Sequence, residues 1–253
     1  MMIKTESLYA EQLQQLHQDG YVLFRNALTP QQTSVIKEGI ALAFEGKGPE
    51  VMLQGPMFER GEPFEQLIDH PGVIEFVEEV LGPECQLSSM NGMRTMKNNG
   101  VSKWHVDEAL FFPLPDGVEW DARIPVPIYL LNALYYLDDI TEELGPTQVV
   151  PGSHRAGKHL SFSEEIEDYN GAGPVSILAN AGDCLLFNSQ IWHRGAPNLS
   201  DTPRYVQQII YRKKFIVPHM SHDVNAAYKP PADIVERAND RRRRLLGVNR
   251  KIF

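Results

Sequence analysis

Long apolar runs, abundant cysteine and a surplus of basic residues are all missing from this sequence of 253 residues. No apolar run approaches the roughly 20 residues that a membrane helix requires, so we expect no membrane partner. The first residues mix acidic and apolar side chains in an order unlike that of a secretory signal, which makes the cytoplasm the expected location. Only two cysteines occur, Cys85 and Cys184. A disulfide framework is therefore not indicated, and buried free thiols are expected.

The acidic balance limits the kind of partner. Asp and Glu number 33 against 24 Lys and Arg, which gives a formal net charge of -9. Affinity for nucleic acid comes largely from clustered cations, so we expect no nucleic-acid partner. The one basic run, residues 241–244, lies in a helical stretch, where such a run is more often a solvated helix face than a binding patch. The sequence leaves the oligomeric state open.

The order of helical and strand-like segments predicts a mainly β protein with flanking helices, in one domain over residues 1–253. No internal repeat or low-complexity linker marks a second domain. We expect helical support and a first strand in residues 1–85, a β core in 86–213 and a helical segment in 214–253. The short strands of the core, separated by turn residues, suit a barrel or jelly roll.

Local patterns set the expected elements. Apolar residues at helical spacing predict helices, an N-cap threonine before proline predicts a helix start, and clusters of Gly and Pro predict a loop that covers something. The expected helices span 8–17, 29–45, 72–81 and 231–246, the loop spans 46–63, and the strands span 21–24, 86–96, 103–111, 127–137, 148–150, 183–187 and 204–211.

Two His-x-Asp pairs occur, and this pattern can supply two of the ligands of a non-haem Fe(II) site. Residues two apart point the same way from a strand but diverge around a helix. His17 and Asp19 end the first expected helix, so their side chains diverge. His105 and Asp107 lie in an expected strand rich in aromatic and branched residues. Only this second pair can converge on one ion.

The third ligand should come from a later strand, and His193 is the best candidate. The strand before it, the turn-rich residues 195–203 and the strand that begins at Arg204 predict an antiparallel hairpin. Such a hairpin would bring Arg204 back beside His193. A planar guanidinium is the group that recognises a terminal carboxylate. The pattern thus places a carboxylate-binding group close to the expected metal.

With these residues in place, the chain resembles the phytanoyl-CoA dioxygenase family of Fe(II)- and 2-oxoglutarate-dependent oxygenases. The likeness covers nearly the whole length and rests on separate segments in the same order. These are residues 19–29, the Trp-His-Val-Asp of 104–107, residues 137–146 with 150–154, and residues 181–193 followed by Asn198 and Arg204. The joint match is much more specific than any one segment.

The resemblance implies a double-stranded β-helix (a cupin-like jelly roll) and the cofactors Fe(II) and 2-oxoglutarate. It also implies an inner surface shared with the metal ligands. The family often has Ser where this chain has Gly195 and Trp where it has Leu134. The expected site comprises the metal ligands and catalytic centre His105, Asp107 and His193; the 2-oxoglutarate contacts Arg204, Met90, Asn132 and Leu134; and the substrate contacts Ser88, Arg94, Phe111 and Tyr136.

The resemblance implies oxidation of an unactivated C–H bond of a small-molecule metabolite by O2, with release of succinate and CO2. Hydroxylation is favoured over halogenation, because related halogenases lack the carboxylate that Asp107 supplies. Residues 46–63 and 112–127 are candidates for a lid over the pocket. A non-catalytic barrel that binds a metal or ligand is the alternative, and a nucleobase demethylase is a third reading that the acidic balance disfavours.

Plainer interpretations stand beside these. His105 with Asp107 can be a solvated strand pair, and His193 alone can be a structural histidine. Arg204 can pair with Asp201 at the surface, where such pairs contribute little. Arg94 and Asn132 can form hydrogen bonds within the barrel only. His154 follows a tight turn, and the family pattern treats it as structural.

Overall fold

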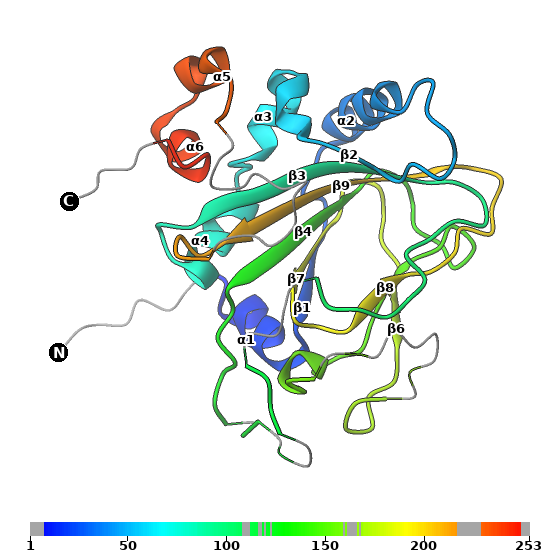
Figure 1. The fold of residues 1–253 in the computed structure, drawn as a ribbon, viewed down its shortest axis with the longest axis vertical. Coiled ribbons are helices and arrows are strands. Elements are labelled where there is room, and N and C mark those ends of the chain that lie inside the picture. Colours follow the sequence, from blue (N-terminus) through cyan, green and yellow to red (C-terminus); the bar gives the residue numbers. More distant parts are fainter. Residues whose placement is uncertain are drawn as a thin grey trace.

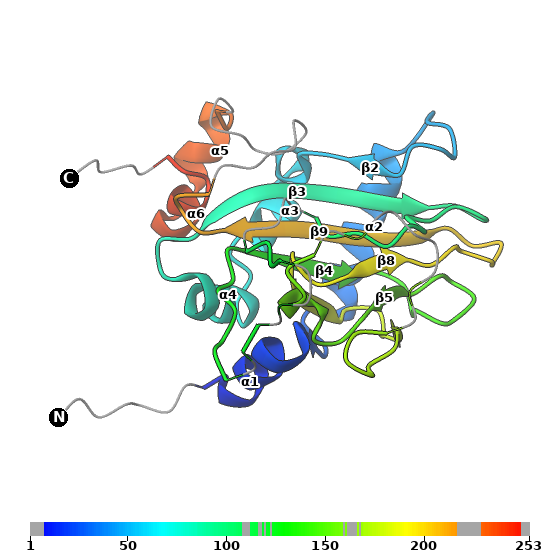
Figure 2. The same cartoon turned by 60° about the horizontal axis from the view of Figure 1, so that its bottom comes forward.

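Two antiparallel sheets form the centre of the molecule, as the computed structural model in Figures 1 and 2 shows. The large sheet has the order β1-β7-β4-β9-β3-β2 and the small sheet the order β6-β5-β8. The mainly β jelly-roll fold expected from the sequence is therefore confirmed. The structure describes residues 8–107, 112–115, 118, 120–121, 123–158, 160, 166, 168–216 and 229–248.

The strands expected at 21–24, 86–96, 127–137, 148–150, 183–187 and 204–211 are present with small shifts at their ends, whereas the short strands at 53–54, 175–177 and 193–195 were not expected. The strands are β1 (Tyr21–Phe24), β2 (Leu53–Gln54), β3 (Gln86–Thr95), β4 (Leu130–Tyr136), β5 (Thr147–Val149), β6 (Val175–Ile177), β7 (Cys184–Asn188), β8 (His193–Gly195) and β9 (Arg204–Arg212).

Helices cover one face of the large sheet (Figure 1). Gly20 ends α1 in the left-handed conformation, φ 85°, which glycine adopts without strain. Thr29 begins α2 with a capping box to Gln32, which satisfies two backbone N–H groups. The helices are α1 (Ala10–Asp19), α2 (Pro30–Ala43), η1 (Met57–Arg60), α3 (Glu62–Leu67), α4 (Val73–Leu81), η2 (Ser153–Arg155), α5 (Ala232–Arg237) and α6 (Asp240–Leu245).

Two hydrophobic clusters lie on opposite faces of the large sheet. The helix-side cluster joins the helices to β3, β4 and β9 and includes Ile40, Phe76 and Met90. The inner cluster lies between the two sheets and includes Leu134 and Tyr136. Because successive side chains of a strand point to opposite faces, these clusters identify the inward-facing positions of each strand. In the described part of the chain, no helix is both long and apolar enough to cross a bilayer.

Residues 46–63 are not the open loop that their Gly and Pro content predicts. Leu53 and Gln54 pair with β3, and Met57 and Phe58 are buried in the helix-side cluster. Burial of these large side chains overrides the local turn signals. The segment is therefore helix-side packing rather than a lid. Of the other lid candidate, residues 112–127, positions 116–117, 119 and 122 lie outside the described residues.

Two further expectations about the strands are wrong. In the described part of residues 103–111, only His105 forms a β-bridge, and its partner is His193. The hairpin expected between residues 183–187 and the strand that begins at Arg204 is also absent, because β4 separates β7 from β9 in the large sheet. The strand that lies between these two in the sequence, β8, belongs to the small sheet. Buried Asn198 fixes the segment that passes from β8 to β9. Its side-chain amide donates to the backbone oxygens of Thr95 and Thr202, at 3.0 and 2.7 Å.

The basic run at residues 241–244 is paired within the chain. Arg241 forms an ion pair with Glu75 at 2.6 Å, and Arg242 pairs with Asp69 at 2.8 Å. Arg244 pairs with Glu78. The run therefore fixes α6 to α4 and to the end of α3.

Candidate metal and cosubstrate site

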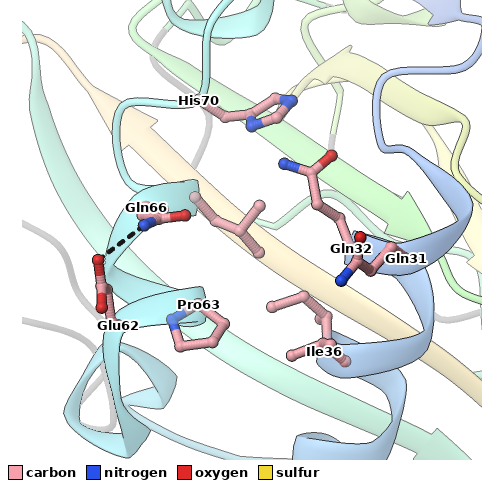
Figure 3. A pocket seen from close by; sticks show the side chains of 9 residues that line it. Gln31, Gln32, Ile36, Glu62, Pro63, Gln66 and His70 are labelled. Atoms are coloured by element: carbon pink, nitrogen blue, oxygen red, sulfur yellow. Dashed lines mark hydrogen bonds between the residues drawn. The ribbon is translucent and has the colours of Figure 1, made fainter.

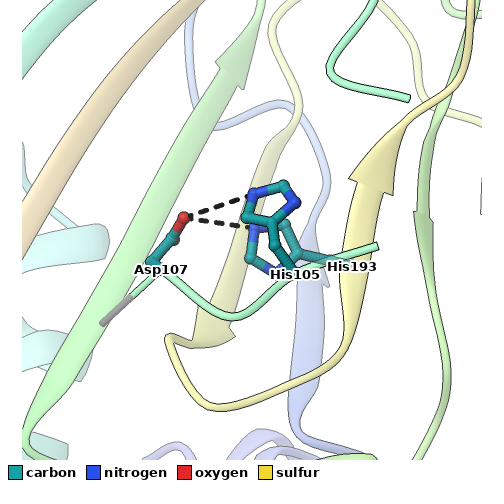
Figure 4. A group of neighbouring side chains, drawn as sticks. All are labelled: His105, Asp107 and His193. Carbon is teal, nitrogen blue, oxygen red and sulfur yellow. Dashed lines mark ion pairs between the residues drawn. The ribbon is translucent and has the colours of Figure 1, made fainter. Parts of the chain in front are cut away.

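His105, Asp107 and His193 converge between the two sheets (Figure 4). One ligand atom from each residue lies within 4.8 Å of the others, and this is the one such group of His, Cys, Asp and Glu among the described residues. The Nε2 atoms of His105 and His193 lie 3.6 and 3.3 Å from Oδ1 of Asp107. Two imidazoles and one carboxylate on one side of a point form the donor set of a non-haem Fe(II) site.

Backbone carbonyls fix both imidazole rings. Nδ1 of His105 lies 2.8 Å from the oxygen of Lys103, and Nδ1 of His193 lies 2.9 Å from the oxygen of Ile191. A carbonyl can only accept, so each Nδ1 carries the proton and each Nε2 has a free lone pair. This arrangement sets the tautomer that a metal needs. The β-bridge between His105 and His193 holds the two backbones together.

The charges of the three side chains suit a cation. Burial and the neighbouring imidazole of His193 lower the pKa of His105. Burial by itself would lower the pKa of His193, but the Asp107 carboxylate outweighs burial and the pKa lies above its ordinary value. Burial opposes ionisation of Asp107, yet His193, His105 and Asn132 hold its pKa below the ordinary value. Asp107 is therefore anionic at neutral pH, and a metal ion would compete with a proton mainly at His193.

The second carboxylate oxygen of Asp107 accepts a hydrogen bond from Asn132. Its side-chain nitrogen donates to Oδ2 of Asp107 at 2.7 Å, and the residue is fully buried. Oδ1 is thus the oxygen that faces both imidazoles. The carboxylate is arranged to give one oxygen to an ion, which leaves other positions of the ion open.

Arg204 lies at the start of β9, buried, with 5% of its surface exposed. Its Nη2 donates to Oγ1 of Thr95 at 3.0 Å, while Nε and Nη1 are buried without a hydrogen-bond partner among the described residues. Asp201, the surface partner considered for Arg204, pairs instead with Lys97 at 2.6 Å. Burial lowers the pKa of this guanidinium, which Tyr136 partly offsets. A buried cation with unmet donors is a site for an anion.

The inner surface of β4 is as the sequence predicts. Asn132 contacts Asp107, whereas Leu134 and Tyr136 belong to the inner cluster. Tyr136 lies near Arg204: burial keeps the pKa of the tyrosine hydroxyl above its ordinary value, although the positive charge of Arg204 lowers that pKa in part. It was expected at the substrate, but this position is at the arginine end of the site. Phe111 lies outside the described residues.

The inner surface expected for β3 is wrong. Met90 belongs to the helix-side cluster, and the Arg94 guanidinium donates to the backbone oxygens of Phe44, Lys47 and Gly48 at the end of α2. A β-bulge between Leu87 and Ser89 shifts the register with β9, and such a bulge changes the face that later residues present. Ser88 is the extra residue of the bulge, with a buried, unpartnered hydroxyl among the described residues.

Three residues of the inner surface were missed. They are Thr95, which accepts from Arg204, Gln208, which donates to Asn132, and Asn91, which donates to Gln208. Gly195 lies against Arg204, since an added Cβ would be 3.4 Å from Nη2. The alternation of β9 from Arg204 could have identified Gln208, because the two residues are four apart. Asn91 and Thr95 could not be found without knowledge of the bulge.

A pocket of about 270 Å³ lies between α2 and α3 (Figure 3). Ile36 and Leu67, which line it, belong to the helix-side cluster. It therefore lies across the large sheet from His105, Asp107 and His193. Its other lining residues are Gln31, Gln32, Val35, Glu62, Pro63, Gln66 and His70.

Known proteins share both the sequence pattern and the fold. The sequence model of the family described as phytanoyl-CoA dioxygenase (PhyH) matches residues 16–206. The L-proline trans-4-hydroxylase of Streptomyces griseoviridis is 25% identical, over 77% of this chain and 83% of that protein. Dioxygenase af480 of Aspergillus fumigatus is 21% identical, over 72% of this chain and 54% of its own. The chain spans about half the length of the first curated relatives it matches.

Solved structures agree on the fold. HygX from Streptomyces hygroscopicus, with nickel and 2-oxoglutarate bound, has a TM-score of 0.65 at 18% identity, covering 83% of this chain and 88% of that one. The 2-oxoglutarate-dependent epimerase SnoN has a TM-score of 0.61 at 19% identity, covering 80% and 82%. The match to the family model spans three quarters of the sequence. It contains His105, Asp107, His193 and Arg204. The chain belongs to the phytanoyl-CoA dioxygenase family.

Proposed function

We propose that this enzyme hydroxylates an unactivated C–H bond of a small metabolite, with Fe(II) on His105, Asp107 and His193 and the distal carboxylate of 2-oxoglutarate on Arg204. When bound, iron with 2-oxoglutarate and O2 supplies the oxidising power, and succinate and CO2 are released. The protein's own part is to hold these groups and to place the C–H bond. The donor set fits the ion, because both Nε2 lone pairs and Oδ1 of Asp107 face one another.

The observation that carries the proposal is the unpaired state of Arg204. A buried guanidinium with two unmet nitrogens is costly unless an anion completes it. No carboxylate of the described residues forms an ion pair with Arg204, whereas Arg241, Arg242 and Arg244 each have one. A dicarboxylic acid that reaches from the metal to Arg204 would supply that anion.

The presence of Asp107 favours hydroxylation over halogenation. A halide would need the position that this carboxylate takes on the ion. Its burial and its bond to Asn132 keep Asp107 anionic and in place. Desaturation or ring formation from the same chemistry would depend on how the substrate lies.

A small-molecule substrate is supported by the relatives. One acts on L-proline, as its name says, and one HygX structure contains hygromycin B. The three basic residues that end β9 and follow it are Arg212, Lys213 and Lys214. They and the arginines of α6 are mostly engaged with other groups of the chain. A cytoplasmic location remains a prediction, supported by the two buried free cysteines.

The test is a panel of small metabolites assayed for succinate formation with Fe(II) and 2-oxoglutarate under air. We expect at least one metabolite to raise succinate formation well above the uncoupled rate. Asp107→Ala is the control, and its rate should fall at least a hundredfold. A non-catalytic barrel would form no succinate with or without substrate. If Asp107→Ala turned over as fast as the parent, the metal assignment would be wrong.

A further inference from the structure

Three side-chain amides form a hydrogen-bonded series across the inner face of the large sheet. Asn91 on β3 donates to Oε1 of Gln208 on β9 at 3.3 Å. Gln208 donates to Oδ1 of Asn132 on β4 at 3.4 Å. Asn132 in turn donates to Oδ2 of Asp107 at 2.7 Å. The three residues come from adjacent strands, because β9 lies between β3 and β4.

The hydrogen bonds of these amides all run in the same direction. Each amide offers its NH2 group toward Asp107 and its carbonyl oxygen away from it. An amide has nearly the same shape when its oxygen and nitrogen are exchanged, so its partners decide which end points where. The nitrogen of Asn132 also lies 3.4 Å from Oγ of Ser189. If Asn132 turned over, its carbonyl oxygen would face the Asp107 carboxylate, which is repulsive.

The orientation matters for the ion. With Oδ2 engaged by Asn132, Asp107 offers Oδ1 alone to the side where the histidine Nε2 atoms lie. A six-coordinate ion with three protein donors keeps three positions for a chelating cosubstrate and O2. A carboxylate that rotated to give both oxygens would take one of those positions. Residues that form hydrogen bonds to a metal-binding side chain commonly contribute ten- to a hundredfold to metal affinity.

We propose that Gln208 and Asn91 are positioning residues, which act through Asn132 to keep Asp107 a one-oxygen ligand. The proposal rests on the function proposed above, since it requires the metal on Asp107. Asn91 and Asn132 are buried, at 5% and 0% exposure, and Gln208 is partly exposed. Gln208 therefore adapts to a substitution more easily than the other two.

The decisive variant is Gln208→Glu. The new carboxylate can still accept from Asn91 but can no longer donate to Asn132. It would instead attract the NH2 group of Asn132 and compete with Asp107 for it. Gln208→Met keeps the length of the side chain and removes both hydrogen bonds without that competition. Gln148→Glu is the matched control, because Gln148 is a strand amide of the small sheet whose oxygen accepts from Arg194 at 2.7 Å.

The measurement is Ni(II) affinity by titration calorimetry, with the visible spectrum of bound Co(II) as a report of coordination. Thermal unfolding without metal shows that each variant is folded. We expect Gln208→Glu to bind Ni(II) about tenfold more weakly and to change the Co(II) spectrum. We expect a smaller loss for Gln208→Met and no change for Gln148→Glu.

The outcomes separate the two proposals. If the parent binds no Ni(II), the proposed metal site fails. If the parent binds but Gln208→Glu keeps its affinity and Co(II) spectrum, only the positioning role is overturned. If Gln208→Glu does not fold, Gln208→Met decides: unchanged affinity and spectrum in that variant would overturn the role of Gln208, and a changed spectrum would support it.

Discussion

The Nη2 atom of Arg204 lies 3.4 Å from the position that a Cβ atom would take on Gly195. Gly195 is two residues after His193 on β8, and Arg204 begins β9 in the facing sheet. The two sheets therefore meet at this point, beside His193 and Arg204.

A side chain at position 195 should affect the cosubstrate. The 3.4 Å separation is an ordinary contact for one added carbon, so Gly195→Ser should fold as the parent does. The serine hydroxyl would lie within reach of Arg204 and of a bound carboxylate. Because it would add one hydrogen bond, we expect the affinity for 2-oxoglutarate to increase up to about fivefold. Gly195→Val should crowd Arg204 and weaken that affinity about tenfold. Calorimetry on the Ni(II)-loaded protein measures both, and a large loss in the serine variant would show that the space is already filled.

Replacement of Arg204 should separate cosubstrate affinity from stability. Arg204→Met removes the anion partner, so 2-oxoglutarate binding should weaken at least a hundredfold while Ni(II) affinity stays the same. The same change removes a buried charge with unmet donors, so the ligand-free protein should be about 1–2 kcal/mol more stable. Arg204→Lys keeps the positive charge but not the planar set of donors, so its affinity for 2-oxoglutarate should be about tenfold weaker than that of the parent. A ligand-free Arg204→Met protein that was much less stable than the parent would indicate another partner for this guanidinium.

Arg94 should matter to stability and not to catalysis. Its guanidinium donates to three backbone oxygens after α2 and lies over the Phe44 ring, 4.5 Å from the ring centroid. Arg94→Met should therefore lower the free energy of unfolding by about 2–3 kcal/mol. The KM for 2-oxoglutarate should change less than twofold. A large rise in KM with unchanged stability would restore the inner-face position first expected for this residue.

Stability should fall in acid because of His154. Burial lowers the pKa of His154 to about 4 from an ordinary value of 6.5. The unfolded chain therefore binds a proton in this interval that the folded chain does not. The contribution is fully present above pH 6.5 and is lost as the pH falls toward 4, by about 3 kcal/mol in all.

The variant His154→Gln isolates this effect. Urea unfolding at pH 7 and at pH 4.5 should show a smaller pH dependence in His154→Gln than in the parent. Equal dependence would mean that His154 is protonated in the fold. The neighbouring oxygen of His17, 3.3 Å from Nε2, gives glutamine a partner to replace the imidazole.

The sequence was sufficient for the elements with strong local signals. Thr29 and Gly20 mark helix ends by capping and by positive φ, and both do so in the structure. The inward phase of β4 followed correctly from its alternation. These features depend on neighbouring residues only, which is why a single sequence predicts them.

Features set by tertiary packing could not be predicted in this way. The bulge after Leu87 reverses the phase of β3, so Met90 and Arg94 turn to the helices. Nothing local marks β8 as a strand of the opposite sheet, since its three residues are placed by pairing with β5. The convergence of His105, Asp107 and His193 was expected, although His105 is held by one bridge rather than by a long strand.

The most direct test of the account is an anaerobic crystal structure of the protein with Fe(II) and 2-oxoglutarate. The account predicts one iron bonded to Nε2 of His105, Nε2 of His193 and a single oxygen of Asp107. It also predicts the distal carboxylate of 2-oxoglutarate paired with Arg204. Iron bound elsewhere, or a 2-oxoglutarate carboxylate that does not reach Arg204, would contradict it.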